Sequence, residues 1–135
     1  MVGILVVTHG NIGKEMVNAV RRILPDATHL MGVAVESNDP PARLREQVNQ
    51  EIDKIQGSEG VLLLTDMFGG TPSNICLSFL RSPNIEVISG VNLPMLIKLA
   101  SMRQRMPFHE LVSFVQQYGQ RNIVVASRVL DGHMQ

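Results

Sequence analysis

The 135-residue sequence has few aromatic side chains, a single cysteine and no excess of charge of either sign. Aromatic residues make up 4% of the chain and tryptophan is absent, so the sequence offers no stacking platform for single-stranded nucleic acid. The 12 basic and 12 acidic residues cancel, which removes the electrostatic reason to expect nucleic acid or an anionic membrane as the main partner. We therefore predict no nucleic-acid partner.

Disulfides and membrane spans are also not indicated. The one cysteine, Cys76, cannot form an internal disulfide or a cysteine-rich metal site. It falls on the expected buried face of a helix, so we interpret it as a core residue. No apolar run approaches the roughly 20 residues that span a bilayer, and the N-terminal run lacks the basic region of a signal peptide. These features predict a cytoplasmic location.

Apolar runs alternate with helical spacings along the chain, a pattern typical of an open α/β fold. Short apolar runs predict strands at residues 4–7, 29–35, 61–64, 85–88 and 123–126. Helices are predicted around residues 16–24 and 39–55, after the caps Thr71 and Asn92, and from 107 to 119. We expect a doubly wound, mainly parallel sheet in the order 2-1-3-4, in one domain over residues 1–128. Residues 129–135 are expected to be a poorly ordered tail.

Two loops of unusual composition follow the first and third predicted strands. They are residues 8–10, which contain His9, and residues 65–74, which begin with Thr65-Asp66. In open α/β sheets, ligands bind beyond the carboxyl ends of the strands, where the strand order reverses. With strands one and three as neighbours, we expect these loops to face each other across that crevice.

His9 is the candidate nucleophile, because a neutral imidazole has one ring nitrogen with a free lone pair near pH 7. The other ring nitrogen needs an acceptor that fixes the tautomer, and Asp66 is placed to be that acceptor. Asp66 would also stabilise the positive charge that develops on the ring as His9 forms a new bond.

The second loop is the candidate anion site. Gly69 and Gly70 let the backbone approach a ligand closely, and the helix from Thr71 points its N–H groups and positive dipole end at the crevice. The hydroxyls of Thr71 and Ser73 could donate further hydrogen bonds to phosphoryl oxygens. The sequence shows no acidic cluster for a metal, so we expect neither metal nor cofactor.

Each of these residues also has an ordinary structural explanation when it is taken alone. A histidine at a strand end is usually structural or solvated, and a Gly-Gly-Thr-Pro loop is usually a turn before a helix. Their joint placement after two parallel strands favours a functional site. We interpret the remaining histidines, His29, His109 and His133, as structural or solvated, and the Arg103 and Arg105 stretch as an exposed helix end.

Three segments resemble the signatures of the mannose-family enzyme IIA of the bacterial sugar phosphotransferase system. They are VVTHG at residues 6–10, DMFGGTPSN at 66–74 and GVNLPML at 90–96, and the resemblance covers essentially the whole chain. It implies that His9 is phosphorylated at Nε2 and partnered by Asp66. It also implies that Thr71, Asn74 and the glycine turn form the phosphate pocket, with residues 92–94 as a third wall.

The resemblance further implies the partners and the assembly. The phosphohistidine protein HPr would be the donor, an enzyme IIB on a separate chain the acceptor, and the membrane would be contacted only through IIC and IID components. The family is usually a homodimer that exchanges its last strand, antiparallel to the partner's sheet, and residues 123–126 match that strand. Related domains that serve dihydroxyacetone kinase depart from Gly-Gly-Thr-Pro after the third strand.

Other functions remain open at this point. Many family members carry a fused IIB domain, whereas this chain stops after the IIA part, so the alternative is a solitary regulatory IIA protein whose His9 phosphorylation controls partner binding. A response-regulator receiver would need acidic residues after the first strand and a late lysine. A histidine phosphatase would have arginine where Thr8 stands, and no nucleotide-binding glycine loop is present. We rank these three below the phosphocarrier.

Overall fold

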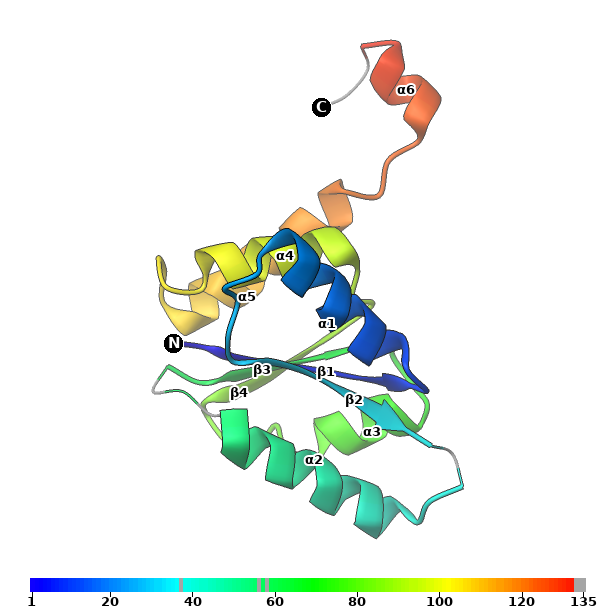
Figure 1. Cartoon of the computed structure of the whole chain (residues 1–135), viewed down its shortest axis with the longest axis vertical. Helices are drawn as coiled ribbons and strands as arrows, with labels where there is room; N and C mark the ends of the chain where they lie inside the picture. The colour runs from blue at the N-terminus through cyan, green and yellow to red at the C-terminus, as the bar shows by residue number, and fades with distance from the viewer. Residues whose placement is uncertain (37, 56, 58, 133–135) are drawn as a thin grey trace.

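Four parallel strands form the centre of the protein in the computed structural model, which describes residues 1–36, 38–55, 57 and 59–132. Their hydrogen-bonded order is β2-β1-β3-β4 (Figure 1), and every pairing between neighbours is parallel. This confirms the predicted sheet order. The strands are β1 (Gly3–His9), β2 (Leu30–Val35), β3 (Val61–Thr65) and β4 (Ile85–Ser89).

Helices cover both faces of the sheet (Figure 1). One face carries α1 (Ile12–Ile23), α4 (Leu93–Met102) and α5 (Phe108–Arg121), and the other carries α2 (Pro41–Ile55) and α3 (Thr71–Leu77). Proline lies in the first positions of α3 and α4, where its missing N–H has no partner to lose. Asn92 caps α4 as predicted, since its side chain accepts a hydrogen bond from the backbone N–H of Met95.

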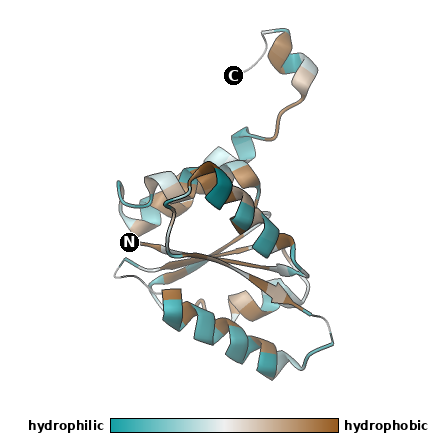
Figure 2. Cartoon of the chain, in the orientation of Figure 1, coloured by the Kyte–Doolittle hydropathy of each residue, from teal (hydrophilic) through white to brown (hydrophobic). Residues whose placement is uncertain are grey.

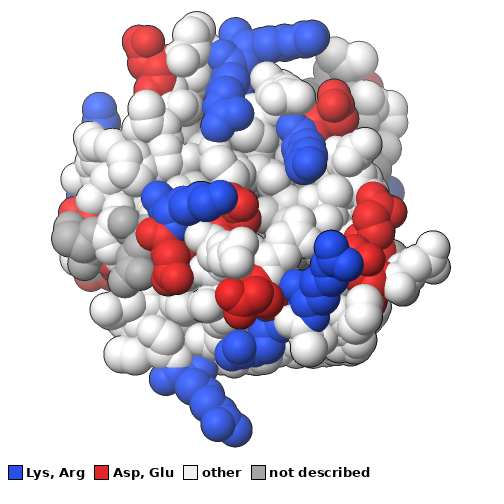
Figure 3. All heavy atoms as spheres, turned by 60° about the horizontal axis from the view of Figure 1, so that its bottom comes forward, with Lys and Arg blue, Asp and Glu red and all other residues white. Residues whose placement is uncertain are grey.

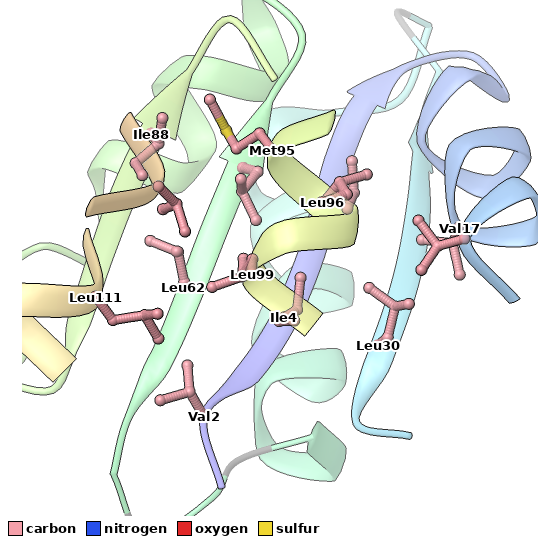
Figure 4. Packing of buried hydrophobic residues seen from close by; sticks show 14 of the residues in the cluster. Val2, Ile4, Val17, Leu30, Leu62, Ile88, Met95, Leu96, Leu99 and Leu111 are labelled. Carbon is pink, nitrogen blue, oxygen red and sulfur yellow. The ribbon is translucent and has the colours of Figure 1, made fainter. Parts of the chain in front are cut away.

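The hydrophobic core is split into two layers because successive strand residues point to opposite faces of the sheet. From β1, Ile4 and Val6 join the layer under α1, α4 and α5, whereas Leu5 and Val7 join the layer under α2 and α3. Figure 4 shows the first layer, and Figure 2 shows the strands as the most apolar part of the chain. Cys76 lies in the second layer, and burial raises the pKa of its thiol to about 12, which confirms its interpretation as a core residue.

The outward face of α2 is polar and carries charges of both signs. Figure 3 turns the lower side of Figure 1 forward and shows basic and acidic side chains interspersed on this face. Solvated charge of this kind keeps the helix amphipathic, with its apolar stripe directed at the sheet. The exposed charged residues of α2 are Arg43, Arg45, Glu46, Asp53 and Lys54.

Arg103 corrects the prediction of an exposed basic stretch after α4. Its side chain is only 4% exposed. The guanidinium donates hydrogen bonds to the carbonyl oxygens of Val2 and His29, at 3.3 and 3.1 Å, and also to that of Thr28. Burial lowers the pKa of Arg103, and the carbonyl dipoles take the place of a carboxylate partner. Arg103 therefore ties the end of α4 to the start of the sheet.

The C-terminal segment also differs from the prediction. Residues 123–125 pair with no strand among the described residues, and Ala126 begins a short helix, α6 (Ala126–Leu130). The predicted strand at 123–126 is therefore wrong within one chain, because the segment leads away from the sheet (Figure 1) and finds no hydrogen-bonding neighbour there. The start of the predicted poorly ordered tail is helical. His133 lies outside the described residues.

No helix within the described ranges is long and apolar enough to cross a membrane.

Candidate functional site

His9 and Asp66 meet at one edge of the sheet because β1 and β3 are parallel neighbours. The register pairs Val7 with Thr65, the last residue of β3, so the two strands end side by side. The predicted loops therefore do face each other. His9 is itself the last residue of β1 and pairs with Val35, so the strand runs two residues beyond its predicted end and carries the histidine on regular backbone.

Hydrogen bonds join the two residues. Nδ1 of His9 lies 2.8 Å from Oδ2 of Asp66, and the backbone N–H of His9 donates to the same oxygen at 3.2 Å. The other oxygen, Oδ1, accepts from the backbone N–H of Met67 at 3.1 Å. Because an ionised carboxylate only accepts, the Nδ1 nitrogen carries the proton in this contact and Nε2 keeps its lone pair. Among the described residues, Nε2 has no hydrogen-bond partner.

The environment keeps the Asp66 carboxylate ionised. Its side chain is 16% exposed, whereas that of His9 is 45% exposed. Burial by itself raises the pKa of Asp66, but the hydrogen bonds from the His9 ring and backbone, together with attraction to a protonated ring, outweigh it and lower this pKa below its usual value. The acceptor for Nδ1–H is therefore present throughout the neutral range.

The lowered pKa of Asp66 predicts a pH dependence of defined sign. The carboxylate contributes stability above the unfolded-state pKa, and this contribution is lost as the pH falls through the lower folded-state pKa. In an NMR pH series, we expect the Asp66 carboxyl carbon to titrate below the usual range, and at a higher pH in His9→Ala. His109→Ala, in α5, should leave the Asp66 curve unchanged. Identical Asp66 curves in the wild type and His9→Ala would contradict the assignment.

The glycine turn lies against the other side of the His9 ring. Gly69 and Gly70 have φ values of +91° and +84°, a region that residues with a Cβ rarely adopt. A Cβ placed on Gly70 would lie 3.3 Å from both Cε1 and Nε2 of His9. The free ring nitrogen therefore faces a backbone surface that only glycine leaves open.

The start of α3 is one residue away from the predicted position. Gly70 occupies the cap position and Thr71 is the first helical residue, so the prediction of Thr71 as the cap is wrong. Glycine tolerates the positive φ at this position, and it is also an accepted N-cap residue, so the chain enters the helix there without a capping side chain. The backbone N–H of Asn74 donates to the Gly70 carbonyl at 3.0 Å, which closes the first turn of the helix.

The three predicted phosphate-binding side chains of α3 are placed differently. Ser73 is fully buried, and within the described residues its hydroxyl has no hydrogen-bond partner. Asn74 is exposed and Thr71 is half-buried. Both lie on a hollow of about 340 Å³ between α2 and α3, which is also lined by Pro41, Arg45, Ile75 and Ser78. The structure thus brings Asp66 and Gly70 to the His9 ring, whereas Thr71 and Asn74 line a hollow that includes neither His9 nor Asp66.

The crevice offers donors suited to an anion. The glycine turn exposes backbone N–H groups at the N-terminus of α3, where the helix dipole is positive. No group of three or more His, Cys, Asp or Glu side chains able to hold a metal occurs across the described residues. Asn92, placed by the resemblance at a third wall, has its side-chain oxygen on Met95 N–H and its amide on the Gly119 carbonyl, each at 3.0 Å, and so joins α4 to α5.

Sequence reasoning missed a hydroxyl pair directly behind Asp66. Thr65 and Ser89 end the neighbouring strands β3 and β4 and pair in register, and their hydroxyl oxygens lie 2.9 Å apart. In the sequence, this pair is visible only as two hydroxyl residues at the ends of predicted strands. Their contact could not be predicted without the strand register, which places the two residues opposite each other.

Comparison with known proteins agrees with the geometry. The family model EIIA-man, described as PTS system fructose IIA component, matches residues 3–116. The PTS system fructose-specific EIIA component of Bacillus subtilis (strain 168) is 26% identical over 132 residues, which is 97% of this chain and 90% of the relative. The PTS system mannose-specific EIIAB component of Escherichia coli (strain K12) is 27% identical over 124 residues, covering 90% of this chain but 38% of that protein.

A solved structure supports the same relationship. The crystal structure of phosphotransferase system component EIIA from Streptococcus agalactiae superposes with a TM-score of 0.84 at 26% identity, covering 94% of this chain and 98% of that one. The family match runs from β1 into α5 and includes both loops of the crevice. The chain therefore belongs to the EIIA-man family of phosphotransferase system IIA components.

Proposed function

We propose that this protein is a phosphocarrier of the sugar phosphotransferase system, which accepts a phosphoryl group on His9 from phospho-HPr and passes it to an enzyme IIB. The observation that carries the proposal is that the two ring nitrogens of His9 have different surroundings. Asp66 holds Nδ1 at 2.8 Å, while Nε2 is unpaired within the described residues and faces Gly70. This arrangement presents one defined nucleophilic nitrogen at an open surface.

The transfer step follows from this arrangement. The Nε2 lone pair attacks the phosphorus of the donor phosphohistidine, an Nε2–P bond forms, and the electron pair of the breaking N–P bond returns to the donor imidazole. The His9 ring, which keeps its Nδ1 proton, becomes positively charged, and the Asp66 carboxylate stabilises that charge. Transfer to enzyme IIB is the same step with His9 as the leaving group, which requires no metal or cofactor.

The backbone around Nε2 supports the binding of the phosphoryl oxygens. In phosphoryl transfer, positioning and electrostatic stabilisation account for most of the catalysis. The turn at Gly69 and Gly70 leads into the positive end of α3, and Thr71 and Asn74 follow in the first turn of that helix. We assign the glycine turn, Thr71 and Asn74 to the phosphate pocket, whereas the buried hydroxyl of Ser73 is assigned no contact with the phosphoryl group.

Large apolar side chains beside His9 favour protein partners. Ile12, Met67 and Phe68 are 50%, 55% and 76% exposed, and all three lie within a few residues of His9 or Asp66 in the chain. Aromatic and methionine side chains are enriched in protein interfaces. A partner that presents its own histidine to Nε2 would bury these side chains, which suits HPr as the donor and enzyme IIB as the acceptor. Contact with the membrane would then pass only through the IIC and IID components.

A phosphorylation assay tests the proposal. The protein is incubated with phosphoenolpyruvate, enzyme I and HPr, and its intact mass and the acid lability of any added group are recorded. We expect one acid-labile phosphoryl group, which is lost again when an enzyme IIB is added. A wild-type protein that remains unmodified while HPr is phosphorylated would overturn the proposal.

We also propose that the protein is a homodimer that exchanges residues 123–126. β4 is an edge strand of the described sheet, and an unpaired edge is a ready template for another strand. Beside it, a hollow of about 280 Å³ is lined by residues of β4 and α5. Ile123, Val124 and Val125 are 78%, 52% and 54% exposed, so pairing with a second copy would remove apolar surface from water.

Sedimentation should show a dimer at micromolar concentration. Replacing both Ile123 and Val125 by aspartate places two charges on one side of the segment, since alternate strand residues share a face. We expect this variant to sediment as a monomer. Ile23→Asp, which changes a similarly exposed residue of α1 (53%), should remain a dimer. A wild type that is strictly monomeric would contradict strand exchange.

A further inference from the structure

Thr65, the residue before Asp66, forms several hydrogen bonds with neighbouring segments. It is fully buried, and its hydroxyl oxygen lies 2.9 Å from the Ser89 hydroxyl and 3.2 Å from the Met67 carbonyl oxygen. Its own carbonyl oxygen accepts hydrogen bonds from the backbone N–H groups of Gly90 and Val91, both at 3.0 Å. One residue thus links the end of β3, the end of β4 and the turn that follows Asp66.

Counting protons fixes the direction of these hydrogen bonds. A carbonyl oxygen only accepts, so the single proton of the Thr65 hydroxyl goes to Met67, and the proton between the two hydroxyls comes from Ser89. The chain of donors therefore runs from Ser89 through Thr65 to Met67. This is the one assignment in which each of the two contacts has a proton of its own, and each hydrogen bond then polarises and strengthens the next.

The final acceptor of these hydrogen bonds, the Met67 carbonyl, lies between the two parts of the site that contact the His9 ring. Met67 directly follows Asp66, which holds Nδ1 of His9, and Gly70, three residues later, faces Nε2. Met67 is also tied from its other side, because its N–H donates to Oδ1 of Asp66 at 3.1 Å. A shift of the Met67 peptide would therefore move the carboxylate and the glycine turn relative to the histidine.

We propose that Thr65, assisted by Ser89, is a positioning residue for phosphoryl transfer: its hydroxyl holds the Asp66–Gly70 turn at the distance from His9 that leaves Nδ1 bound and Nε2 open. Thr65 touches neither His9 nor the phosphoryl group and acts through Met67. The effect on transfer rests on the proposed function, whereas the effect on the turn and on the histidine tautomer does not.

Two variants of Thr65 separate the hydroxyl from the shape of the side chain. Thr65→Val keeps the volume and removes the hydroxyl, and Thr65→Ser keeps the hydroxyl. We expect Thr65→Val to lower the rate of phosphoryl acceptance by about five- to tenfold, the range expected for loss of one hydrogen bond. The Nδ1–H tautomer of His9, measured by nitrogen NMR, should be less populated, and the amides of residues 67–70 should exchange faster. Thr65→Ser should restore all three readouts toward the wild type.

Ser89→Ala and Ser101→Ala serve as test and control. Ser89→Ala removes the outer donor and should shift the same readouts in the same direction by a smaller factor. The Ser101 hydroxyl also donates to a backbone carbonyl, that of Ile97, at 3.0 Å, but in the last turn of α4, so Ser101→Ala should change none of them.

The proposal is overturned if Thr65→Val leaves the tautomer and the amide exchange of residues 67–70 unchanged, or if Thr65→Ser behaves like Thr65→Val. A wild type that accepts no phosphoryl group would refute the proposed function alone. The NMR readouts would still decide the positioning role of Thr65, since they need no phosphoryl donor.

Discussion

Replacing His9 by alanine is expected to abolish phosphoryl acceptance while leaving the fold intact. The imidazole supplies the only atom that bonds to phosphorus in the proposed step, so no residual acid-labile group should form in the presence of phospho-HPr. The His9 side chain is 45% exposed, and its loss removes one hydrogen bond to Asp66 rather than a part of the core. Intact mass measures the acceptance, and thermal unfolding measures the fold.

Two other histidines provide matched controls for this result. His29 is exposed in the loop before β2, and His109 is exposed in the first turn of α5. His29→Ala and His109→Ala should each accept one phosphoryl group as the wild type does. A His9→Ala protein that is still phosphorylated would place the nucleophile elsewhere, and loss of acceptance in His109→Ala would point to a general defect in docking.

The layout of the sheet explains why the central part of the site could be predicted. Continuous apolar runs identify buried parallel strands, and once β1 and β3 are neighbours their carboxyl ends must meet. His9 and Asp66 each follow such a run, so their approach depends on topology and not on the details of packing. The hydrogen bond of 2.8 Å between them is the consequence.

The burial of a side chain by residues far away in sequence could not be predicted in the same way. Arg103 has the local pattern of an exposed helix end, yet its guanidinium is held by carbonyls about 75 and 101 residues away in sequence. Ser73 has the composition of a ligand contact, yet α3 turns its hydroxyl inward. In both cases the polar side chain is expected to be exposed to solvent, but contacts with distant parts of the chain bury it.

In the C-terminal segment, the local sequence favours a strand that the fold of one chain does not form. Ile123, Val124 and Val125 are three consecutive β-branched residues, which favour strands. A strand also needs a hydrogen-bonding neighbour, and within the described chain this segment has none. The backbone at Val125 is nevertheless extended, with φ −93° and ψ 117°, so the local preference is expressed without the pairing.

Gly70→Ala is expected to cause the second large loss of activity, for a steric reason. The new Cβ would lie 3.3 Å from Nε2 and Cε1 of His9, on the side where we propose that the phosphoryl group binds. Misplacing reacting atoms by about 1 Å can cost a factor of ~100 in rate, so we expect acceptance to fall by at least about that factor. The measurement is the rate of phosphorylation by phospho-HPr.

The same substitution also strains the backbone, and the two effects must be separated. Gly70 has φ 84° and ψ 176°, a region used almost only by glycine, and an alanine there costs about 1–3 kcal/mol of stability. Gly69→Ala is the matched control. Gly69 also has a positive φ of +91°, but a Cβ there meets no atom within 4 Å.

If occlusion of Nε2 controls the rate, both alanine variants should lose stability in thermal unfolding, but Gly70→Ala should lose far more activity than Gly69→Ala. Equal losses of activity would instead assign the effect to strain in the turn. Full activity in Gly70→Ala would show that the phosphoryl group approaches His9 from another side, and the phosphate pocket would then have to be placed away from α3.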